Sequence, residues 1–406
     1  MKRIGIIGGG AAGMAAAAFC ENASVTVLER NEKLGKKVYI TGKGRCNVTN
    51  NCALYEFYPN IVRGEKFMIS SLTAFPPQAL MEFLGGNGVR VKTERGNRVF
   101  PFSDKASDVI KAFASRMEQR GVRVVLDARV SDVAENDGEF TVATDKCSFV
   151  FDSLIVATGG ISYKSTGSTG DGYKIAERFG HTVVKPVPAL SAIELADDVK
   201  DLEGLSLKNV RITVKPGGKA VSGFGEMLFT DKGISGPIVL TVSSYINRFN
   251  LRGERMTIDF KPALSPETLD ERLTSDFGEL HNKDLANILT SLLPKAIIPY
   301  VLAQSGVSGE IKGHSIKREQ RYALGYSVKN LKFTIKGLAD VNSAVITSGG
   351  VSTAEVNPKT MESKLTKGLY FAGEVLDVDA LTGGYNLQCA FATGRAAGIA
   401  ASGGNE

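Results

Sequence analysis

The chain has 406 residues, of which 43% are hydrophobic and 23% are charged, a composition typical of a globular protein. A single hydrophobic core rarely serves so many residues, so we expect at least two domains. The formal net charge of +6 is spread along the chain without a run of Lys or Arg, which permits an anionic partner such as RNA but requires none.

Several classes of protein are disfavoured by what the sequence lacks. Five cysteines and three widely separated histidines provide neither a disulfide framework nor the ligand spacing of a metal site. No apolar run reaches the roughly 18 residues of a membrane-spanning helix. The apolar stretch that ends at Phe19 contains several glycines and lacks a small-residue cleavage site, which argues against a signal peptide. We therefore expect a cytoplasmic protein with no metal and no membrane contact.

The chain opens with the pattern of a βαβ unit. Residues 4–7 predict a short strand, residues 11–20 a helix of strong helix formers, and residues 25–28 a second strand. The turn between the first strand and the helix, residues 8–13, reads GGGAAG and matches the G-x-G-x-x-G pattern of dinucleotide-binding proteins. In that pattern the first glycine allows a tight turn, the second lets the backbone approach a pyrophosphate, and the third lets the helix pack on the strand. The free N–H groups at the start of the helix would face the pyrophosphate.

An acidic residue follows the second strand. Glu29 lies 21 positions after Gly8, where dinucleotide-binding domains place the carboxylate that accepts hydrogen bonds from ribose hydroxyls. A carboxylate at this position favours an unphosphorylated ribose, as in FAD or NAD, over NADP.

A long polar loop and a second apolar strand come next. Residues 35–50 are polar and rich in glycine, and the length of this loop indicates a functional role. Residues 107–119 predict a helix, and short β-rich runs between 122 and 144 predict a meander that turns at residues 137 and 138. Residues 152–157 predict a buried strand that ends in Thr158, Gly159 and Gly160, small residues suited to lie beside the adenosine half of a dinucleotide.

The composition changes near residues 185–188, which read KPVP. Beyond this point, residues 207–214 and 256–260 predict strands of an antiparallel layer, and residues 265–304 are mostly helical with a break at Pro294. We therefore expect a discontinuous nucleotide-binding domain made of residues 1–187 and 341–406, with residues 188–340 inserted into it as a substrate domain.

The last segment returns to strand, loop and helix. Residues 369–372 predict a strand, Gly373 and Glu374 follow it, and Gly383-Gly384-Tyr385-Asn386 begins a helix that runs to about residue 401. The positive end of that helix can stabilise the negative charge of a reduced flavin. An NAD-binding domain would not need this segment, so the three motifs together predict FAD as the cofactor.

Five short motifs carry a resemblance to a known family. Residues 43–50 (KGRCNVTN), 98–101 (RVFP), 228–237 (LFTDKGISGP), 373–377 (GEVLD) and 383–386 (GGYN) resemble those of the BaiN-like family of bacterial NAD(P)/FAD-dependent oxidoreductases. The resemblance covers essentially the whole chain. It implies an α/β fold: a Rossmann-type, glutathione-reductase-like FAD-binding domain with an inserted domain that has a β-barrel part, about 188–262, and a helical part, about 263–330.

What this family does is not uniform. The resemblance implies NAD(P)H-dependent reduction of conjugated carbon–carbon double bonds, as in bile-acid intermediates, but relatives also include an rRNA dihydrouridine synthase and aminoacetone oxidases. One position departs from the family pattern: Asp231 stands where many members have histidine. If that histidine assists proton transfer, the role is altered here; alternatively, residue 231 only caps the following turn.

The motifs and the resemblance together define an expected FAD site. Its residues come from the dinucleotide turn, the polar loop, the meander and the two later strand ends. They are Gly8, Gly10, Ala12, Gly13, Glu29, Arg30, Lys36, Gly42, Gly44, Arg45, Asn47, Val130, Thr158, Gly159, Gly160, Gly373, Glu374, Asp377, Gly384, Tyr385 and Asn386.

Three residues are expected to act on the substrate. Arg45 (or its neighbour Lys43) would hold an anionic or carbonyl group, and Cys46 would protonate the carbon opposite hydride delivery. Tyr385 is a second candidate proton donor. The alternative is that the loop only binds the flavin and its ribityl chain. A dithiol role for Cys46 and Cys52 is disfavoured, because no second G-x-G-x-x-G motif appears and no histidine follows His314.

The missing second dinucleotide motif also bears on the electron donor. NADH or NADPH would have to bind transiently over the flavin, or the electrons would come from the substrate itself. Our first hypothesis is NAD(P)H-driven reduction of a conjugated double bond in a small enone or in a uridine of rRNA. The alternatives are an amine oxidase that uses oxygen and an RNA-binding flavoprotein without catalysis. The sequence leaves the oligomeric state open.

Overall fold

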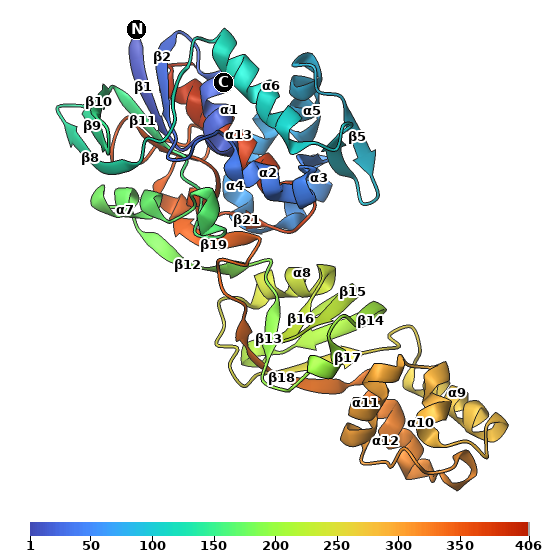
Figure 1. The fold of residues 1–406 in the computed structure, drawn as a ribbon. Helices are drawn as coiled ribbons and strands as arrows, with labels where there is room; N and C mark the ends of the chain where they lie inside the picture. The colour runs from blue at the N-terminus through green and yellow to red at the C-terminus, as the bar shows by residue number, and fades with distance from the viewer. Residues whose placement is uncertain (405–406) are drawn as a thin grey trace. The chain divides into compact units, whose positions relative to one another are not determined.

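A computed structural model describes residues 1–404, and its contacts divide the chain into two compact units (Figure 1). Unit 1 joins Met1–Ala189 to the segment that begins at Val341, and unit 2 is Leu190–Asp340. The boundary between them lies close to the one expected at residues 187 and 188. Each unit has its own hydrophobic core.

The centre of unit 1 is a parallel sheet with strand order β20-β11-β1-β2-β7. Its strands are β1 Lys2–Ile7, β2 Ala23–Leu28, β7 Arg123–Val125, β11 Ser153–Val156 and β20 Leu369–Phe371. In this sheet Ile4 of β1 pairs with Val25 on one side and with Ser153 on the other. Strands β1 and β11 are apolar along most of their length because a parallel sheet is covered on both faces.

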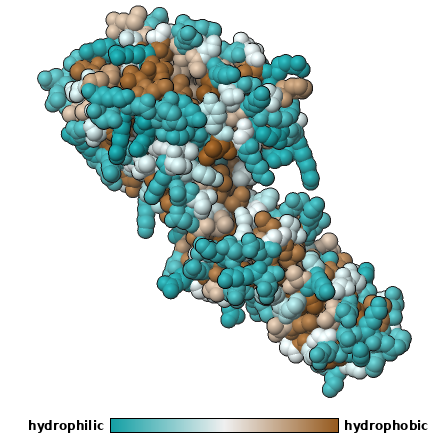
Figure 2. Space-filling view, in the orientation of Figure 1, coloured by the Kyte–Doolittle hydropathy of each residue, from teal (hydrophilic) through white to brown (hydrophobic). Residues whose placement is uncertain are grey.

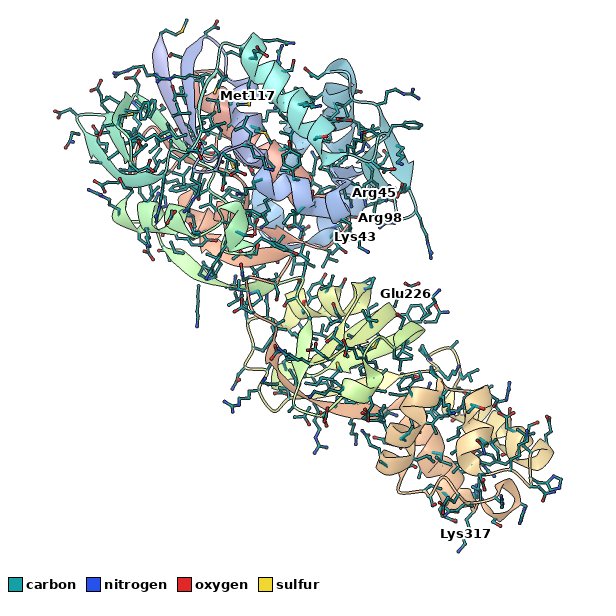
Figure 3. The ribbon with its side chains drawn as sticks, viewed as in Figure 1. Lys43, Arg45, Arg98, Met117, Glu226 and Lys317 are labelled. Atoms are coloured by element: carbon teal, nitrogen blue, oxygen red, sulfur yellow. The ribbon has the colours of Figure 1, made fainter. Side chains whose placement is uncertain are left out.

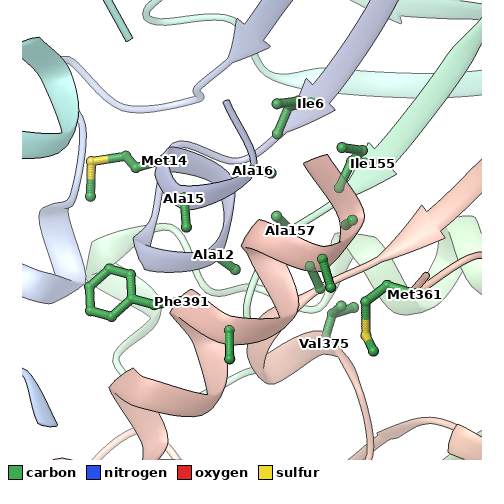
Figure 4. Close-up of a cluster of buried hydrophobic side chains, with 14 of the residues drawn as sticks. Ile6, Ala12, Met14, Ala15, Ala16, Ile155, Ala157, Met361, Val375 and Phe391 are labelled. Atoms are coloured by element: carbon green, nitrogen blue, oxygen red, sulfur yellow. The ribbon is translucent and has the colours of Figure 1, made fainter. Parts of the chain in front are cut away.

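Two helices from opposite ends of the chain pack together in unit 1: α1, Ala11–Phe19, and α13, Tyr385–Ala401. Small residues make the contact possible. A Cβ added at Gly394 would lie 2.2 Å from the carbonyl oxygen of Ala12, and one at Gly398 would lie 2.2 Å from that of Ala16. Figure 4 shows the alanines of α1 beside Phe391 of α13. The helices therefore approach backbone to backbone, which only glycine allows at these positions.

Smaller sheets and helices complete unit 1. The sheets have the orders β10-β9-β8, β12-β19, β21-β4 and β3-β6-β5. Their strands are β3 Thr49–Asn50, β4 Ile61–Arg63, β5 Val91–Glu94, β6 Arg98–Pro101, β8 Val130–Asn136, β9 Glu139–Thr144, β10 Ser148–Phe151, β12 Val183–Ala189, β19 Ile346–Val351 and β21 Asp379–Ala380. The helices are α2 Lys36–Ile40, α3 Leu54–Phe57, α4 Glu65–Ala74, α5 Pro77–Gly86, α6 Ala106–Gln119 and α7 Asp171–Arg178.

Unit 2 is a closed barrel followed in sequence by a helical part. The barrel order is β13-β16-β15-β14-β17-β18. Its strands are β13 Ile193–Leu195, β14 Ser206–Val214, β15 Val221–Thr230, β16 Gly233–Ser235, β17 Arg255–Asp259 and β18 Leu331–Leu338. The helices are α8 Pro237–Ile246, α9 Pro266–Glu279, α10 Leu285–Ile288, α11 Ile298–Ser305 and α12 Arg318–Lys329. The barrel part expected at 188–262 omitted β18, which returns after the helices to close the barrel.

Figure 2 shows hydrophilic residues over much of the face that it presents, including the edge of unit 1 where β5 lies. Within residues 1–404, no helix is both long and apolar enough to cross a membrane. No group of three or more His, Cys, Asp or Glu side chains in the same residues is placed to hold a metal ion.

Candidate functional site

The turn between β1 and α1 contains two kinds of glycine. Gly8 and Gly13 pack closely against the protein, whereas Gly10 faces open space. A Cβ added at Gly8 would lie 2.5 Å from the carbonyl oxygen of Ala157, and one at Gly13 would lie 1.8 Å from that of Gly8. A Cβ added at Gly10 would meet no atom within 4 Å. Gly8 and Gly13 therefore hold the helix against the sheet, whereas Gly10 leaves room for a ligand to approach the backbone.

Helices α1 and α13 of unit 1 both begin without a capping side chain. Helix α1 starts after Gly10 and α13 after Gly384, and neither has a side-chain cap or an acidic residue in its first turn. The N–H groups of a first helical turn have no partner within the helix and carry partial positive charge. Both helix starts can therefore bind a phosphate or an anionic ring.

Several buried side-chain oxygens have no hydrogen-bond partner among the described residues, and three of them belong to the sequence motifs: Oδ1 of Asn47, Oγ1 of Thr49 and Oγ1 of Thr158. Thr49 lies against the start of α13, since a Cβ at Gly384 would be 2.3 Å from its carbonyl oxygen. Buried polar atoms are nearly always paired. Polar groups of a bound ligand would satisfy these atoms, and the hydroxyls, amides and phosphates of FAD match that requirement.

The ribose-binding candidate Glu29 is fixed by the chain itself. Its Oε2 accepts a hydrogen bond of 2.7 Å from the backbone N–H of Gly9, and its Oε1 accepts one of 2.8 Å from that of Asn31. The carboxylate is 6% exposed. Oε1 also accepts a hydrogen bond of 2.6 Å from Nδ2 of Asn31, so Oε2 is the oxygen that keeps a lone pair and can accept from a ribose hydroxyl.

Other expected cofactor residues near Glu29 have protein partners. Nη1 of Arg30 lies 2.9 Å from Oδ2 of Asp171, and Nζ of Lys36 lies 3.1 Å from Oε2 of Glu32. Val130 begins β8 and pairs with the meander strand β9. The two cations are therefore engaged within unit 1, and any contact with a cofactor would have to be shared with these partners.

The polar loop after α2 has an unusual backbone. Gly42, Lys43, Gly44 and Cys46 all have positive φ, between 56° and 85°. Such a conformation is unfavourable for Lys and Cys, and residues of this kind gather at ligand sites. Strand β3, which contains Thr49, follows the loop directly.

Arg45 and Cys46 differ in exposure: the Arg45 side chain is partly exposed, whereas Cys46 is buried. The Arg45 guanidinium forms ion pairs with Glu94 and, at 2.6 Å, with Asp104, and it lies 4.1 Å from the centre of the Phe100 ring. Cys46 has no exposed surface, and burial raises the pKa of its thiol to about 12. A proton-donor role for Cys46 would therefore require the loop to move.

Cys52, the possible partner of Cys46, is also a free thiol. Burial raises the pKa of Cys52 to about 11, and the Glu56 carboxylate adds to the shift. Asp231 lies in unit 2, exposed in the turn between β15 and β16.

Glu374 is the centre of a hydrogen-bond network that the motifs did not predict. Its Oε2 lies 2.8 Å from Nζ of Lys37, and its Oε1 accepts a hydrogen bond of 2.8 Å from the backbone N–H of Thr347. Lys37 also donates to Oγ of Ser162 at 2.7 Å. These partners come from distant parts of the chain, and no local pattern distinguishes Lys37 from its neighbour Lys36.

The same network surrounds the end of β11. Oγ1 of Thr347 accepts from the N–H groups of Ile161 and Ser162 at 2.8 and 3.2 Å. A Cβ at Gly160 would lie 2.3 Å from that hydroxyl oxygen, so Gly160 is required for packing. Gly159 has a φ of 74° and follows Thr158 at the turn.

The residues before α13 form a rigid loop. The side-chain amide of Asn386 accepts from the N–H of Ala380 at 2.9 Å and donates to its carbonyl oxygen at 2.7 Å. Asp379 is fully buried, and its carboxylate pairs with Arg63 at 3.2 Å.

The two expected cofactor residues Gly373 and Asp377 lie in the preceding segment. Gly373 packs against α1, since a Cβ added to it would be 2.7 Å from the Cβ of Ala12. The backbone N–H of Asp377 bonds to Val351.

Tyr385 is the first residue of α13. Its ring packs edge-on against Phe57 with 4.8 Å between centroids, and the residue is 9% exposed. Burial raises the pKa of its hydroxyl to about 12, and the negative charge of the Glu56 carboxylate adds to the shift. The hydroxyl therefore keeps its proton at neutral pH and can donate it.

The chain is similar to known proteins along nearly its whole length. Residues 2–400 match the family described as HI0933-like protein Rossmann domain. The chain is 34% identical over 415 residues to 3-dehydro-bile acid Δ(4,6)-reductase of Clostridium scindens, an alignment that covers 99% of each protein. It is 31% identical over 404 residues to ribosomal RNA dihydrouridine synthase of Haemophilus influenzae, covering 98% of each.

A solved structure shows the fold alone. The 3-ketosteroid Δ1-dehydrogenase of Sterolibacterium denitrificans aligns with 99% of this chain and 100% of its own, with a TM-score of 0.50 and 13% identity. Together with the family match and the closed barrel of unit 2, this likeness confirms the expected Rossmann-type fold with an inserted domain. The chain therefore belongs to the HI0933-like Rossmann family of FAD-dependent oxidoreductases.

Proposed function

We propose that this protein is a cytoplasmic enzyme that uses NADH or NADPH to reduce a conjugated carbon–carbon double bond, and that its substrate is a uridine of ribosomal RNA. The observation that carries the proposal is end-to-end similarity, at 34% and 31% identity, to enzymes named for two reductions of this kind. The 5,6 double bond of uridine is conjugated with a carbonyl group, as is the Δ4 bond of a 3-oxo steroid. One active-site chemistry therefore serves both substrates.

The residues of unit 1 fit FAD. The start of α1 at Gly10 would hold the pyrophosphate, Glu29 the ribose, and the start of α13 the flavin ring. Bound FAD supplies hydride transfer, the step that amino-acid side chains cannot perform. Asn47, Thr49 and Thr158 have the unpaired buried oxygens that such a ligand would satisfy.

The chain itself would supply the proton that completes the reduction. Tyr385 holds a protonated hydroxyl at the start of α13, and that hydroxyl makes no hydrogen bond within the described residues. We assign it the donor role ahead of the fully buried Cys46. Arg45 is held by two carboxylates and by the Phe100 ring, so its guanidinium is positioned to orient a carbonyl or phosphate group.

A small enone is the second candidate substrate, because the bile acid reductase shares slightly more sequence identity with this chain than the dihydrouridine synthase does. Uridine in RNA is preferred because the chain carries a formal net charge of +6, which favours a polyanion over a small enone.

The test is an anaerobic experiment with the purified flavoprotein. We expect NADH or NADPH to bleach the visible absorbance of the flavin, and unmodified rRNA then to restore it with formation of dihydrouridine. Restoration by a steroid enone but not by rRNA would select the second candidate. Oxygen consumption with an amine and no bleaching by either nicotinamide would overturn the proposal in favour of an amine oxidase. Tight RNA binding without any change in the flavin spectrum would indicate a non-catalytic flavoprotein.

A further inference from the structure

The hairpin of β5 and β6 in unit 1 presents one face on which cations and aromatic rings alternate. Lys92 pairs with Phe100 and Glu94 with Arg98, and the backbone N–H of Phe102 bonds to the carbonyl oxygen of Arg90. Because side chains alternate between the faces of a strand, these residues share one face, on which Phe100 is itself buried, and Val99 between Arg98 and Phe100 is buried on the other face.

The aromatic rings of this face are covered by positive charge. The Phe100 ring has the Arg45 guanidinium 4.1 Å and the Arg98 guanidinium 5.8 Å from its centre. The Phe102 ring has Arg90 at 4.8 Å and Lys92 at 5.9 Å, yet it remains 59% exposed. The cation–π contacts keep the Phe102 ring exposed between two positive charges, an arrangement that suits a ligand with both an aromatic face and negative charge.

Only part of the positive charge is neutralised within the protein. Arg45 and Lys92 form ion pairs with Glu94 and Asp104. The remaining cations of the hairpin and of its neighbouring loops form no ion pair with any residue that the structure describes, and all are exposed: Lys43, Arg90, Arg95, Arg98 and Lys105. Figure 3 shows Lys43, Arg45 and Arg98 on the same side of unit 1. We call these five cations and Phe102 the hairpin surface.

The hairpin surface is joined directly to the candidate site. Nδ2 of Asn50 donates to the carbonyl oxygen of Gly96 in the hairpin turn at 3.0 Å and to that of Gly383 at 3.1 Å. Gly383 precedes the start of α13, and β3, which contains Asn50, pairs with β6. A strand that lies on the hairpin surface can therefore extend toward Tyr385 without leaving unit 1.

We propose that the hairpin surface binds the single-stranded segment of RNA that presents the target base, a proposal that rests on the proposed function. Unpaired arginines and lysines bind phosphates, and an exposed phenylalanine stacks with an unpaired base. Five free cations and one exposed ring match a single strand, whereas duplex RNA hides its base faces. The hairpin surface thus selects single-stranded RNA over duplex before any chemistry occurs.

The experiment measures binding of a labelled single-stranded oligouridine to the FAD-loaded enzyme as a function of salt concentration. The test variant is Arg90→Gln/Arg95→Gln/Arg98→Gln. The matched control removes the same charge from exposed lysines of unit 2 without ion-pair partners among the described residues, as Lys283→Gln/Lys295→Gln/Lys317→Gln. We expect the test variant to lower the slope of log K against log salt by about 2, since each phosphate contact with a single strand contributes about 0.7. Phe102→Ala should weaken binding roughly tenfold.

Controls separate this proposal from neighbouring ones. Both triple variants should retain FAD and the wild-type rate of flavin reduction by NADPH, and duplex RNA should bind more weakly than the single strand. An unchanged slope and affinity in the test variant, or an equal loss in the control, would overturn the proposal. So would an effect on flavin reduction by NADPH alone, because the surface would then bind the nicotinamide. RNA binding that depends on the hairpin without reduction of uridine would overturn the proposed function and leave the binding surface standing.

Discussion

Nζ of Lys37 lies 2.8 Å from Oε2 of Glu374, so a helix near the start of the chain is tied to the loop that follows the last strand of the parallel sheet. Both side chains are 21% exposed. The pair is therefore partly shielded from water, and it fixes α2 relative to the loop after β20. Ser162 and Thr347 complete the network.

Removing the cation of this pair should destabilise unit 1. Lys37→Met leaves the Glu374 carboxylate without its charged donor, and we expect a loss of about 1–2 kcal/mol in the free energy of unfolding. Urea denaturation measures the change. Lys66→Met is the control, because Lys66 is exposed and has no ion-pair partner among the described residues. Equal stabilities for the two variants would show that the Lys37 pair contributes no more than a surface charge.

Gly10 and Gly13 should respond differently to substitution. A side chain at Gly10 enters open space, so Gly10→Val is expected to fold and to be colourless, because the valine occupies the space of the pyrophosphate. A Cβ at Gly13 would lie 1.8 Å from a backbone oxygen, so Gly13→Ala should fail to fold. Circular dichroism and the flavin absorbance distinguish the two. A yellow Gly10→Val protein would contradict the assigned position of the cofactor.

The contact between α1 and α13 should tolerate no methyl group. Gly394→Ala places a Cβ 2.2 Å from the carbonyl oxygen of Ala12, and we expect a loss of about 3 kcal/mol or more. Gly278→Ala, in helix α9, meets no atom within 4 Å and should be neutral or stabilising by up to about 1 kcal/mol. Thermal unfolding compares the variants, and a stable Gly394→Ala protein would be incompatible with the observed packing.

His181 should make the protein less stable in mild acid. Burial lowers the pKa of this histidine below 6.5, although the nearby Glu355 carboxylate opposes the shift. Below pH 6.5 His181 binds a proton in the unfolded chain but not in the folded chain. Its contribution to the free energy of unfolding is therefore fully present above pH 6.5 and decreases as the pH falls toward the pKa of the folded state. Urea unfolding between pH 7 and pH 5 should show this loss in the wild type and a shallower loss in His181→Gln. Parallel pH profiles would assign the acid sensitivity to other groups.

Measurements of turnover can decide whether Tyr385 or Cys46 is the proton donor. If Tyr385 is the proton donor, Tyr385→Phe should slow substrate reduction by about a hundredfold while reduction of the flavin by NAD(P)H stays unchanged. Cys46→Ser should retain FAD and near wild-type turnover, because the thiol has no exposed surface. Stopped-flow measurement of the two half-reactions gives both rates. The reverse pattern would return the donor role to Cys46.

Local patterns predicted the parts of the site that depend on neighbours in sequence. The glycine spacing of residues 8–13 determines where a strand can turn into a helix, and Glu29 follows from the length of one βαβ unit. The start of α13 followed from Gly383 and Gly384 in the same way. These features need no knowledge of distant contacts.

Long-range contacts decided what the patterns left open. The partner of Glu374 is Lys37 and that of Arg30 is Asp171, and neither pairing has a signal in the local sequence. Its place in a polar loop suggested that Cys46 could act on the substrate, but its side chain has no exposed surface. Strand β18 joins the barrel after the whole helical part, a pairing that depends on tertiary register rather than on composition.

The packing of α13 on α1 also sets an order of events during synthesis. Helix α1 leaves the ribosome early, but the helix it packs against begins only at Tyr385, close to the end of the chain. Synthesis proceeds at about 5–20 residues per second, so the apolar face of α1 stays uncovered for tens of seconds before α13 is made. Unit 2 lies wholly within the intervening segment and can complete its own core during that time. We therefore expect chaperones to bind the exposed apolar surface of the nascent N-terminal segment. We also expect FAD to bind only when synthesis is nearly complete, because the start of α13 belongs to its site.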